Sequence, residues 1–300
     1  MFCDFRLRPP MGDFLGTAQY NLERNARIAT RFGMYQAEST ARLSMDLFLE
    51  EMDAAGISLG VMPGRYSEVF GNVSCASLRA IMAAYPGRFA AFAGVDPLDT
   101  PSAFEILDSE VMNGPFAGIN VEPLTAHKTP LFADDRRIYP LYERAQECGI
   151  PVMLMTGGIP DVPIDYTHPR HVENVAVDFP SLTIITPHGC WPHARELIRV
   201  CLLRENVYLS PDIYSMGLPG HMDYIQAGTT FLQDRFLYGS AHPTLPMEGC
   251  AAFFRSLNIR EDVLRKICRE NALRVLNQKE EKSGTALTEH DRSNIQNYIP

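Results

Sequence analysis

The sequence predicts an α/β protein that folds as a TIM (β/α)8 barrel, with a loop insertion after the first strand and an extra C-terminal helix. Short apolar runs rich in β-branched residues recur along the chain and are typical of strands buried on both faces. Segments with helical spacing separate these runs, and such strand–helix–strand units connect with right-handed crossovers. Eight strands of this kind close naturally into a barrel. A doubly wound open sheet is the alternative that the pattern leaves open.

The strands are predicted at residues 2–8, 57–62, 89–95, 116–121, 151–155, 182–186, 207–209 and 236–238. Prolines mark where some of them end. Asp96-Pro97 follows the third strand and Pro187 follows the sixth, and proline has no N–H group to donate to a sheet. His188 therefore comes directly after a buried strand, and a flexible glycine follows it.

The helices of the barrel are predicted at residues 44–55, 73–85, 102–111, 138–148, 170–179, 194–204, 222–227 and 248–257. Gly56 and Gly149 are expected to end the helices at 44–55 and 138–148. Ser102 is expected to cap the helix at 102–111, and Pro192 suits the first turn of the helix that runs through 194–204. An amphipathic helix is expected at 260–278. Residues 1–278 are thus expected to form a single barrel, followed by a polar tail, 279–300, that packs loosely or against a neighbour.

Residues 9–43 are predicted to form a long irregular segment, since glycines stand at positions 12, 16 and 33. Loops of this length in compact domains are usually functional. We expect this segment to cover the barrel mouth, as a lid or as a dimer contact.

Composition excludes several classes of protein. The chain has 300 residues, 46% of them hydrophobic, which is enough for a full core. Its net charge is -9 and it has no Lys/Arg-rich run, so no nucleic-acid partner is expected. The apolar runs have the length of strands, so neither a membrane span nor a signal peptide is expected. Seven scattered cysteines without a C-x-x-C motif indicate reduced thiols in a cytoplasmic protein.

His188 is the first candidate catalytic residue, because α/β enzymes place chemistry at the C-terminal ends of strands and imidazole suits a general acid or base. The alternative is a structural histidine that holds neighbouring loops. Asp212, after strand seven, is a candidate to orient it, or else a helix cap or turn residue. His242, after strand eight, is a second candidate acid or base, although its side chain could point in another direction.

Arg6 and Arg8 stand two residues apart on the first predicted strand, so both point to the same face. If that face is the barrel interior, the two guanidinium groups can bind a carboxylate or phosphate. The alternative is an internal salt bridge, for instance with Glu122 or Asp212. Further substrate-binding candidates are Asn120 and Glu122 at the end of strand four, Thr156 before two glycines, and Trp191 and Tyr214, which are as often core residues.

Three stretches resemble the amidohydrolase superfamily, specifically the amidohydrolase-2 branch that includes aminocarboxymuconate-semialdehyde decarboxylase and pyrone dicarboxylate lactonase. The first consists of residues 116–123, 134–135, 139–145 and 149–152, the second of residues 168–184 and 188–189, and the third of residues 236–243. The resemblance spans nearly the whole chain, and the middle stretch is the most specific. It implies a TIM barrel with its site at the C-terminal strand ends, and it matches His188 to a catalytic histidine of the decarboxylases.

The resemblance also implies a metal motif that this chain has lost. The branch typically has Asp-x-His-x-His on strand one, where this chain has arginines at 6 and 8. Strand five typically ends in histidine, here Met155, and strand eight in Gly-Ser-Asp, here Gly-Ser-Ala241. Arginine and alanine cannot ligate a metal, and a thioether does not suit Zn²⁺ or Mn²⁺. We therefore expect no metal and no other cofactor.

The sequence thus predicts a metal-independent hydrolase or lyase that opens lactones, hydrolyses or decarboxylates a small carboxylated molecule. Arg6 and Arg8 would hold the anionic group and His188 would move the proton. The alternative is a catalytically inactive barrel that binds an anionic ligand or a partner protein. A homo-oligomer stays open.

Overall fold

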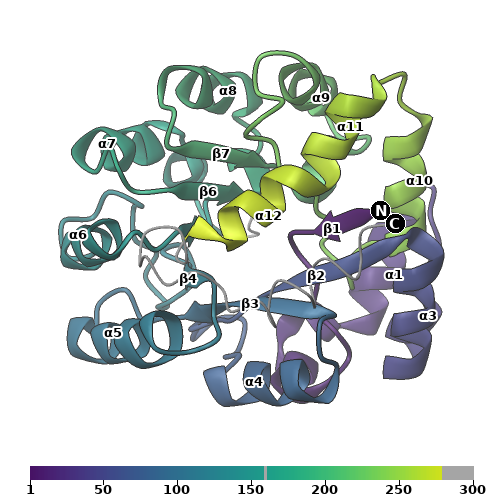
Figure 1. Cartoon of the computed structure of the whole chain (residues 1–300), viewed down its shortest axis with the longest axis horizontal. Helices are drawn as coiled ribbons and strands as arrows, with labels where there is room; N and C mark the ends of the chain where they lie inside the picture. The colour runs from purple at the N-terminus through teal and green to yellow at the C-terminus, as the bar shows by residue number, and fades with distance from the viewer. Residues whose placement is uncertain (159–160, 279–300) are drawn as a thin grey trace, which may run out of the picture.

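The computed structural model describes residues 1–158 and 161–278 and has seven parallel strands in sequential order, with helices packed outside them (Figure 1). The strands are β1 Phe2–Asp4, β2 Ile57–Pro63, β3 Phe89–Gly94, β4 Gly118–Val121, β5 Val152–Leu154, β6 Ile184–Pro187 and β7 Val207–Ser210. The predicted TIM barrel is confirmed, and the open sheet is not formed.

The eighth predicted strand is present only as a single parallel bridge between Phe236 and Leu209. Backbone hydrogen bonds nevertheless complete the ring there. Leu237 N donates to Leu209 O at 2.9 Å, and Phe5 N donates to Tyr238 O at 2.8 Å. The prediction of a regular strand at 236–238 is therefore wrong, although these residues fill the eighth position.

Alternating side chains divide the core into two layers, as the period of two in a strand requires. Each of the eight strand positions around the barrel contributes at least one apolar side chain to the interior. These side chains form one cluster: Cys3, Phe5, Val61, Phe92, Ala117, Met153, Ile185, Tyr208 and Leu237. The intervening side chains, such as Ile119 and Leu209, pack outward against the helices.

The helices outside the barrel lie close to their predicted positions: α3 Met45–Ala55, α4 Cys75–Ala84, α5 Thr100–Ile106 with a π-helical turn Leu107–Met112, α6 Tyr139–Cys148, α7 Arg170–Asp178, α8 Ala194–Leu203, α9 His221–Thr229 and α10 Met247–Ser256. Gly56 and Gly149 end α3 and α6 in left-handed conformations, as predicted. Two predictions about how helices begin are wrong. Asp99 rather than Ser102 caps α5, because its carboxylate accepts from Ser102 N. Pro192 lies before the cap of α8 at His193.

The extra C-terminal helix closes the N-terminal end of the barrel (Figure 1). It runs through α11 Glu261–Arg265, the π-helical turn Lys266–Glu270 and α12 Asn271–Leu276. Ala272 and Val275 of α12 join the interior apolar cluster. The predicted tail at 279–300 lies outside the described residues.

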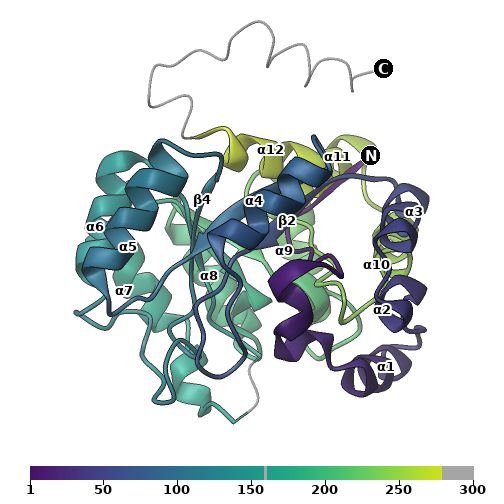
Figure 2. The same ribbon diagram turned by 90° about the horizontal axis from the view of Figure 1, so that it is seen from below.

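The insertion after β1 is more regular than predicted, since it contains α1 Leu22–Arg31 and α2 Glu38–Arg42 besides two 3-10 turns. Asn21 starts α1 by accepting a hydrogen bond from Arg24 N at 2.9 Å. α1 is mostly polar and buries little more than Asn25 and Ala29, so it lacks the wide apolar stripe that identifies most helices. α1 and α2 lie at the opposite end of the barrel from α12 (Figure 2).

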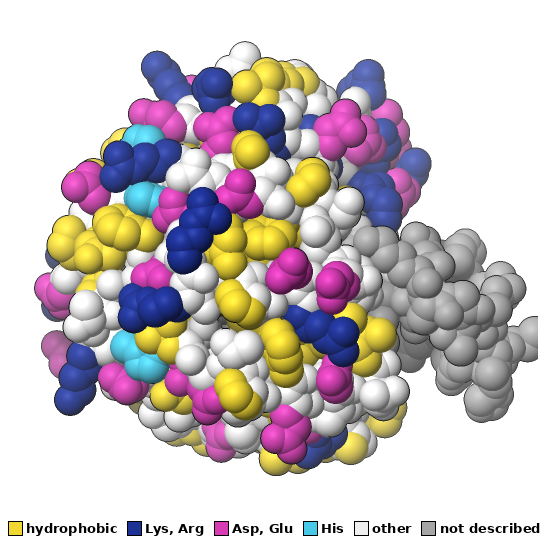
Figure 3. All heavy atoms as spheres, turned by 90° about the vertical axis from the view of Figure 1, so that its left-hand side faces the viewer, with side chains coloured by type: hydrophobic (Ala, Val, Ile, Leu, Met, Phe, Trp, Pro, Cys, Tyr) yellow, Lys and Arg dark blue, Asp and Glu magenta, His cyan; other side chains and the backbone are white. Residues whose placement is uncertain are grey.

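Charges of both signs are interspersed over the face that carries α6 and α7 (Figure 3). Arg136 and Asp178 form one of its ion pairs, at 3.2 Å. Within the described ranges, no helix is long and apolar enough to cross a bilayer.

Candidate functional site

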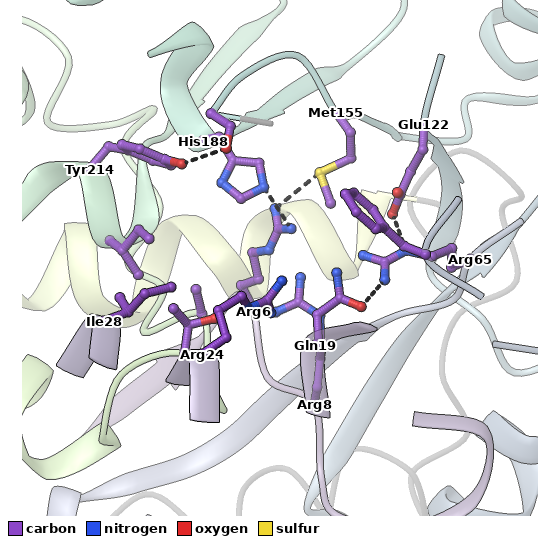
Figure 4. Close-up of a pocket in the computed structure, with 15 residues that line it drawn as sticks. Arg6, Arg8, Gln19, Arg24, Ile28, Arg65, Glu122, Met155, His188 and Tyr214 are labelled. Carbon is purple, nitrogen blue, oxygen red and sulfur yellow. Dashed lines mark hydrogen bonds and ion pairs between the residues drawn. The ribbon is translucent and has the colours of Figure 1, made fainter. Parts of the chain in front are cut away.

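A cavity of about 150 Å³ lies at the C-terminal ends of the strands, and four arginines line it (Figure 4). Arg6 and Arg8 follow β1, Arg65 follows β2, and Arg24 comes from α1 of the insertion. Met155 after β5 and His188 after β6 also line it. Each of these barrel residues stands just past the end of a strand, which is where this architecture brings distant segments together.

The cavity holds more positive than negative charge. Arg65 Nε forms an ion pair with Glu122 Oε1 at 2.9 Å, and Arg6 Nη1 lies 3.4 Å from Asp212 Oδ2. Among the described residues, Arg8 and Arg24 form no ion pair. Four guanidinium groups against two carboxylates leave an excess of two positive charges when His188 is neutral.

Arg8 is only 3% exposed, and its guanidinium makes one hydrogen bond to a described residue, a long one from Nη1 to the His242 carbonyl oxygen at 3.4 Å. Burial, together with the neighbouring Arg6 and Arg65, lowers the pKa of the Arg8 guanidinium well below its usual value. A buried cation with so few partners is unfavourable unless an anion joins it.

Arg6 lies between the ends of β5, β6 and β7, and Figure 4 shows its guanidinium directed at His188 and Met155. Its Nη2 lies 3.0 Å from His188 Nε2, and its Nη1 lies 3.0 Å from Met155 Sδ. Arg6 Nε has no hydrogen-bond partner within the described part of the chain. Because a thioether is a weak acceptor, the guanidinium is poorly satisfied.

The carboxylate of Asp212, which follows β7, lies close to both His188 and Arg6. Asp212 Oδ1 lies 3.4 Å from His188 Nδ1, and Asp212 Oδ2 accepts from the His188 backbone N at 3.3 Å. Burial would raise the pKa of Asp212, but His188 and Arg6 lower it below its usual value. Burial and Arg6 lower the pKa of His188 below its usual value, which favours the neutral imidazole. Both residues have left-handed backbones, φ 65° and 44°, a conformation that non-glycine residues adopt mainly where surrounding contacts enforce it.

Glu122 lines the cavity and is held in place by several donors. Asn120 Nδ2 donates to Oε1 and Thr125 Oγ1 to Oε2, both at 3.1 Å, in addition to the ion pair with Arg65. Burial would raise the pKa of Glu122, but Arg65 lowers it below its usual value. Asn120 itself does not line the cavity, and it also donates to Gly64 O at 2.7 Å.

Besides Asn120 and Asp212, three predicted site residues do not line the cavity. Thr156 Oγ1 is buried 3.1 Å from Cys190 Sγ, and Trp191 Nε1 donates to Pro219 O at 3.1 Å. His242 packs edge-on against Phe48 with Nε2 3.2 Å from Thr40 Oγ1, and burial lowers its pKa to about 3. The turn at Ala241, φ 56°, directs the next side chain away from the cavity. The geometry therefore does not support His242 as an acid or base.

Tyr214 lines the cavity as predicted, and its hydroxyl donates to Gly158 O at 3.0 Å. Its ring lies edge-on to His188 and stacks on Trp191, so Trp191 supports this wall from behind. The N–H of Gly158 donates to Trp191 O at 3.2 Å and is not available to an anion.

Several lining residues were not predicted, above all Gln19, Arg24 and Arg65. Gln19 Oε1 accepts a hydrogen bond from Arg65 Nη1, so the insertion is tied to the barrel at the cavity. The insertion thus lies at the barrel mouth, as predicted, while its role as a lid or a dimer contact stays a prediction. Arg65 could have been found by the reasoning that found His188, because it also follows a strand end.

Comparison with known proteins identifies the family. The sequence profile described as amidohydrolase matches residues 22–278. The chain belongs to the amidohydrolase family. The resemblance to its amidohydrolase-2 branch is thus confirmed.

Solved structures share the amidohydrolase fold. An uncharacterized TIM-barrel protein from Bordetella bronchiseptica has 41% sequence identity and a TM-score of 0.86, covering 93% of this chain and 99% of its own. A 2,6-dihydroxybenzoate decarboxylase has 19% identity and a TM-score of 0.62, covering 83% and 95%. The 4-oxalomesaconate hydratase of Rhodopseudomonas palustris has 18% identity and a TM-score of 0.62, covering 95% and 98%. At such low identity the last two show the fold alone. No curated protein matches the chain.

The side chains at the family's metal positions do not fit a divalent ion. Arginine, methionine and alanine stand at positions 6, 8, 155 and 241, and the Arg6 guanidinium lies against both His188 and Met155. Within the described ranges, no group of three or more His, Cys, Asp or Glu residues could hold a metal. A cation in this place would also be repelled by Arg6 and Arg8. That the protein works without zinc or manganese stays a prediction.

Proposed function

We propose that this amidohydrolase-family protein is a metal-independent enzyme that acts on a small carboxylated molecule. The reaction is hydrolysis, lactone opening or decarboxylation, each of which includes a proton transfer that His188 can carry out. Arg6 and Arg8 bind the anionic group of the substrate, and His188 moves the proton.

The observation that carries this proposal is Arg8, a guanidinium almost fully buried in a cavity without an ion-pair partner among the described residues. Taking an unpaired charge out of water costs several kcal/mol. A carboxylate in the cavity would offset that cost with charge-assisted, bidentate hydrogen bonds. The excess of two positive charges favours an anionic ligand over a neutral one.

His188 is suited to transfer a proton because it is neutral and lies in the cavity wall. Asp212 faces Nδ1 and Arg6 faces Nε2, so the proton of the imidazole belongs on Nδ1. This leaves the Nε2 lone pair as the basic site. A histidine oriented by a carboxylate is a common general base, and such a base contributes about 10²–10⁴-fold to a rate.

The second candidate function, an inactive barrel that binds an anion, is favoured by one observation. Arg6 Nη2 already occupies His188 Nε2 at 3.0 Å. A base whose lone pair is permanently engaged cannot accept a proton, whereas the anion site would still function.

Turnover and binding measured on the same chelator-treated protein separate the two functions. The substrates are a panel of carboxylated lactones, esters and hydroxybenzoates, and the binding probe is malonate. The enzyme predicts turnover of at least one compound, a kcat lowered about 100-fold or more in His188→Gln, and binding retained in that variant. Saturable malonate binding without turnover of any compound supports the binder. Activity that requires about one zinc or manganese per chain contradicts metal independence.

A further inference from the structure

We propose that Arg6 is a ligand-operated gate on His188: an anionic group of the ligand takes the Arg6 N–H donors and thereby frees the lone pair of His188 Nε2. This inference rests on the proposed function, because it describes how the binding of the anion prepares the base. It makes Arg6 a positioning residue as well as an anion ligand.

The Arg6–His188 contact settles which nitrogen of the imidazole is unprotonated. Arg6 Nη2 lies 3.0 Å from Nε2, and a guanidinium has donors and no acceptor. His188 Nε2 must therefore accept, so its lone pair points at Arg6. Without a change at Arg6, that lone pair cannot take a proton from a substrate.

Arg6 is poorly held by its present partners. Nη1 donates to the Met155 thioether at 3.0 Å, and the nearest carboxylate oxygen, of Asp212, is 3.4 Å away. Nε has no hydrogen-bond partner among the described residues. A carboxylate from a ligand can accept two parallel hydrogen bonds from one guanidinium, which is stronger than an imidazole and a thioether together. The ligand therefore competes well for Arg6.

The surrounding charges direct an anion to Arg6 rather than to Arg65, the arginine that is paired with Glu122. Glu122 and the Gln19 carbonyl already engage Arg65. Arg8 has no ion-pair partner in the described chain and lies close enough to Arg6 for that neighbouring charge to lower the pKa of the Arg8 guanidinium. An anion between Arg6 and Arg8 would relieve this repulsion. The backbone of Arg6 stays fixed meanwhile, since its N donates to Asp4 Oδ1 at 3.0 Å.

Nuclear magnetic resonance of ¹⁵N-histidine-labelled protein tests the gate, with malonate as the anion and His188→Gln to assign the signal. In the free protein, the His188 Nε2 signal should have the position of an unprotonated, hydrogen-bonded nitrogen. Saturating malonate should move it toward the position of an unprotonated nitrogen without a donor. Arg6→Met should show that second position without malonate, and malonate should no longer move it.

Arg24→Met is the matched control, because Arg24 lines the same cavity without an observed contact to His188. It should leave the Nε2 signal of the free protein unchanged. If Arg6→Met fails to fold, the malonate titration of the wild type decides the question alone. Identical Nε2 signals in free wild type and Arg6→Met, or in free and malonate-saturated wild type, overturn the gate. If malonate does not bind at all, the proposed function fails, and the comparison of the free proteins still shows whether Arg6 holds Nε2.

Discussion

Individual charged residues in this barrel are balanced in different ways. Arg65 is neutralised by Glu122 inside the protein, whereas Arg8 has no ion-pair partner in the described chain. The two arginines are similarly buried, so they should respond differently to substitution. The effects of substitution on stability should therefore distinguish Arg65, which belongs to a structural ion pair, from Arg8, which we propose binds the anion.

Arg8→Met should raise the free energy of unfolding of the ligand-free protein by about 1–4 kcal/mol, because an apolar side chain of similar length replaces a buried, unneutralised cation. Urea denaturation at neutral pH measures the change. Arg8→Lys, which keeps the charge, should not stabilise the protein. A loss of stability in Arg8→Met would mean that Arg8 has an internal partner in solution.

Glu122→Gln should lower the free energy of unfolding by about 3–5 kcal/mol, because it leaves Arg65 buried without its carboxylate. The same denaturation experiment measures it. Glu110→Gln is the control, since it breaks an ion pair with Arg79, whose side chain is 45% exposed, and should cost less than about 1 kcal/mol. Equal losses in the two variants would contradict a buried structural role for Glu122.

Asp4 should make stability depend on pH. Burial raises its pKa to about 6, although hydrogen bonds from Ser240 act in the opposite direction. The folded protein therefore keeps this proton to a higher pH than the unfolded chain, whose carboxyl titrates near 4. Stability relative to Asp4→Asn should fall as pH rises from about 4 to about 6, and should be constant above that. Unfolding free energies of both proteins at pH 4 and pH 7 test this, and a difference that is the same at both pH values would refute it.

At the scale of elements, the strand ends were the most informative part of the sequence. Several predicted strand ends were placed correctly, and residues predicted just past them, such as Glu122 and His188, do line the cavity. The helices of the insertion could not be predicted with the same ease, because α1 is mostly polar and lacks a wide apolar stripe. His242 was misplaced because a single left-handed residue, Ala241, redirects the chain.

The insertion should contribute to anion binding through Arg24 on α1. Arg24→Met should weaken malonate binding by less than about tenfold, since this side chain is partly exposed and solvent screens its charge. Arg27→Met on the same helix removes an exposed arginine outside the cavity and should change nothing. Titration calorimetry compares the three proteins. Equal effects of the two substitutions would point to general charge attraction instead of a contact in the cavity.

At the scale of the whole molecule, the alternation of strands and helices was enough to predict a barrel. Each of the eight strand positions brings at least one apolar side chain into a shared interior, and α12 closes the end opposite the cavity. What the sequence pattern could not supply was the pairing of charges, which depends on distances between segments far apart in the chain. The contacts of Arg6 with His188 and Met155 are an example, because the three residues come from distant parts of the chain.

The central claim, that the buried arginines of the cavity bind an anion, is tested most directly by titrating malonate into chelator-treated wild type and Arg8→Met. We predict saturable binding to the wild type without added metal, and binding weakened at least about tenfold in Arg8→Met, the loss of one charge-assisted contact. Equal affinity of the two proteins, or binding that appears only after zinc or manganese is supplied, would contradict the claim.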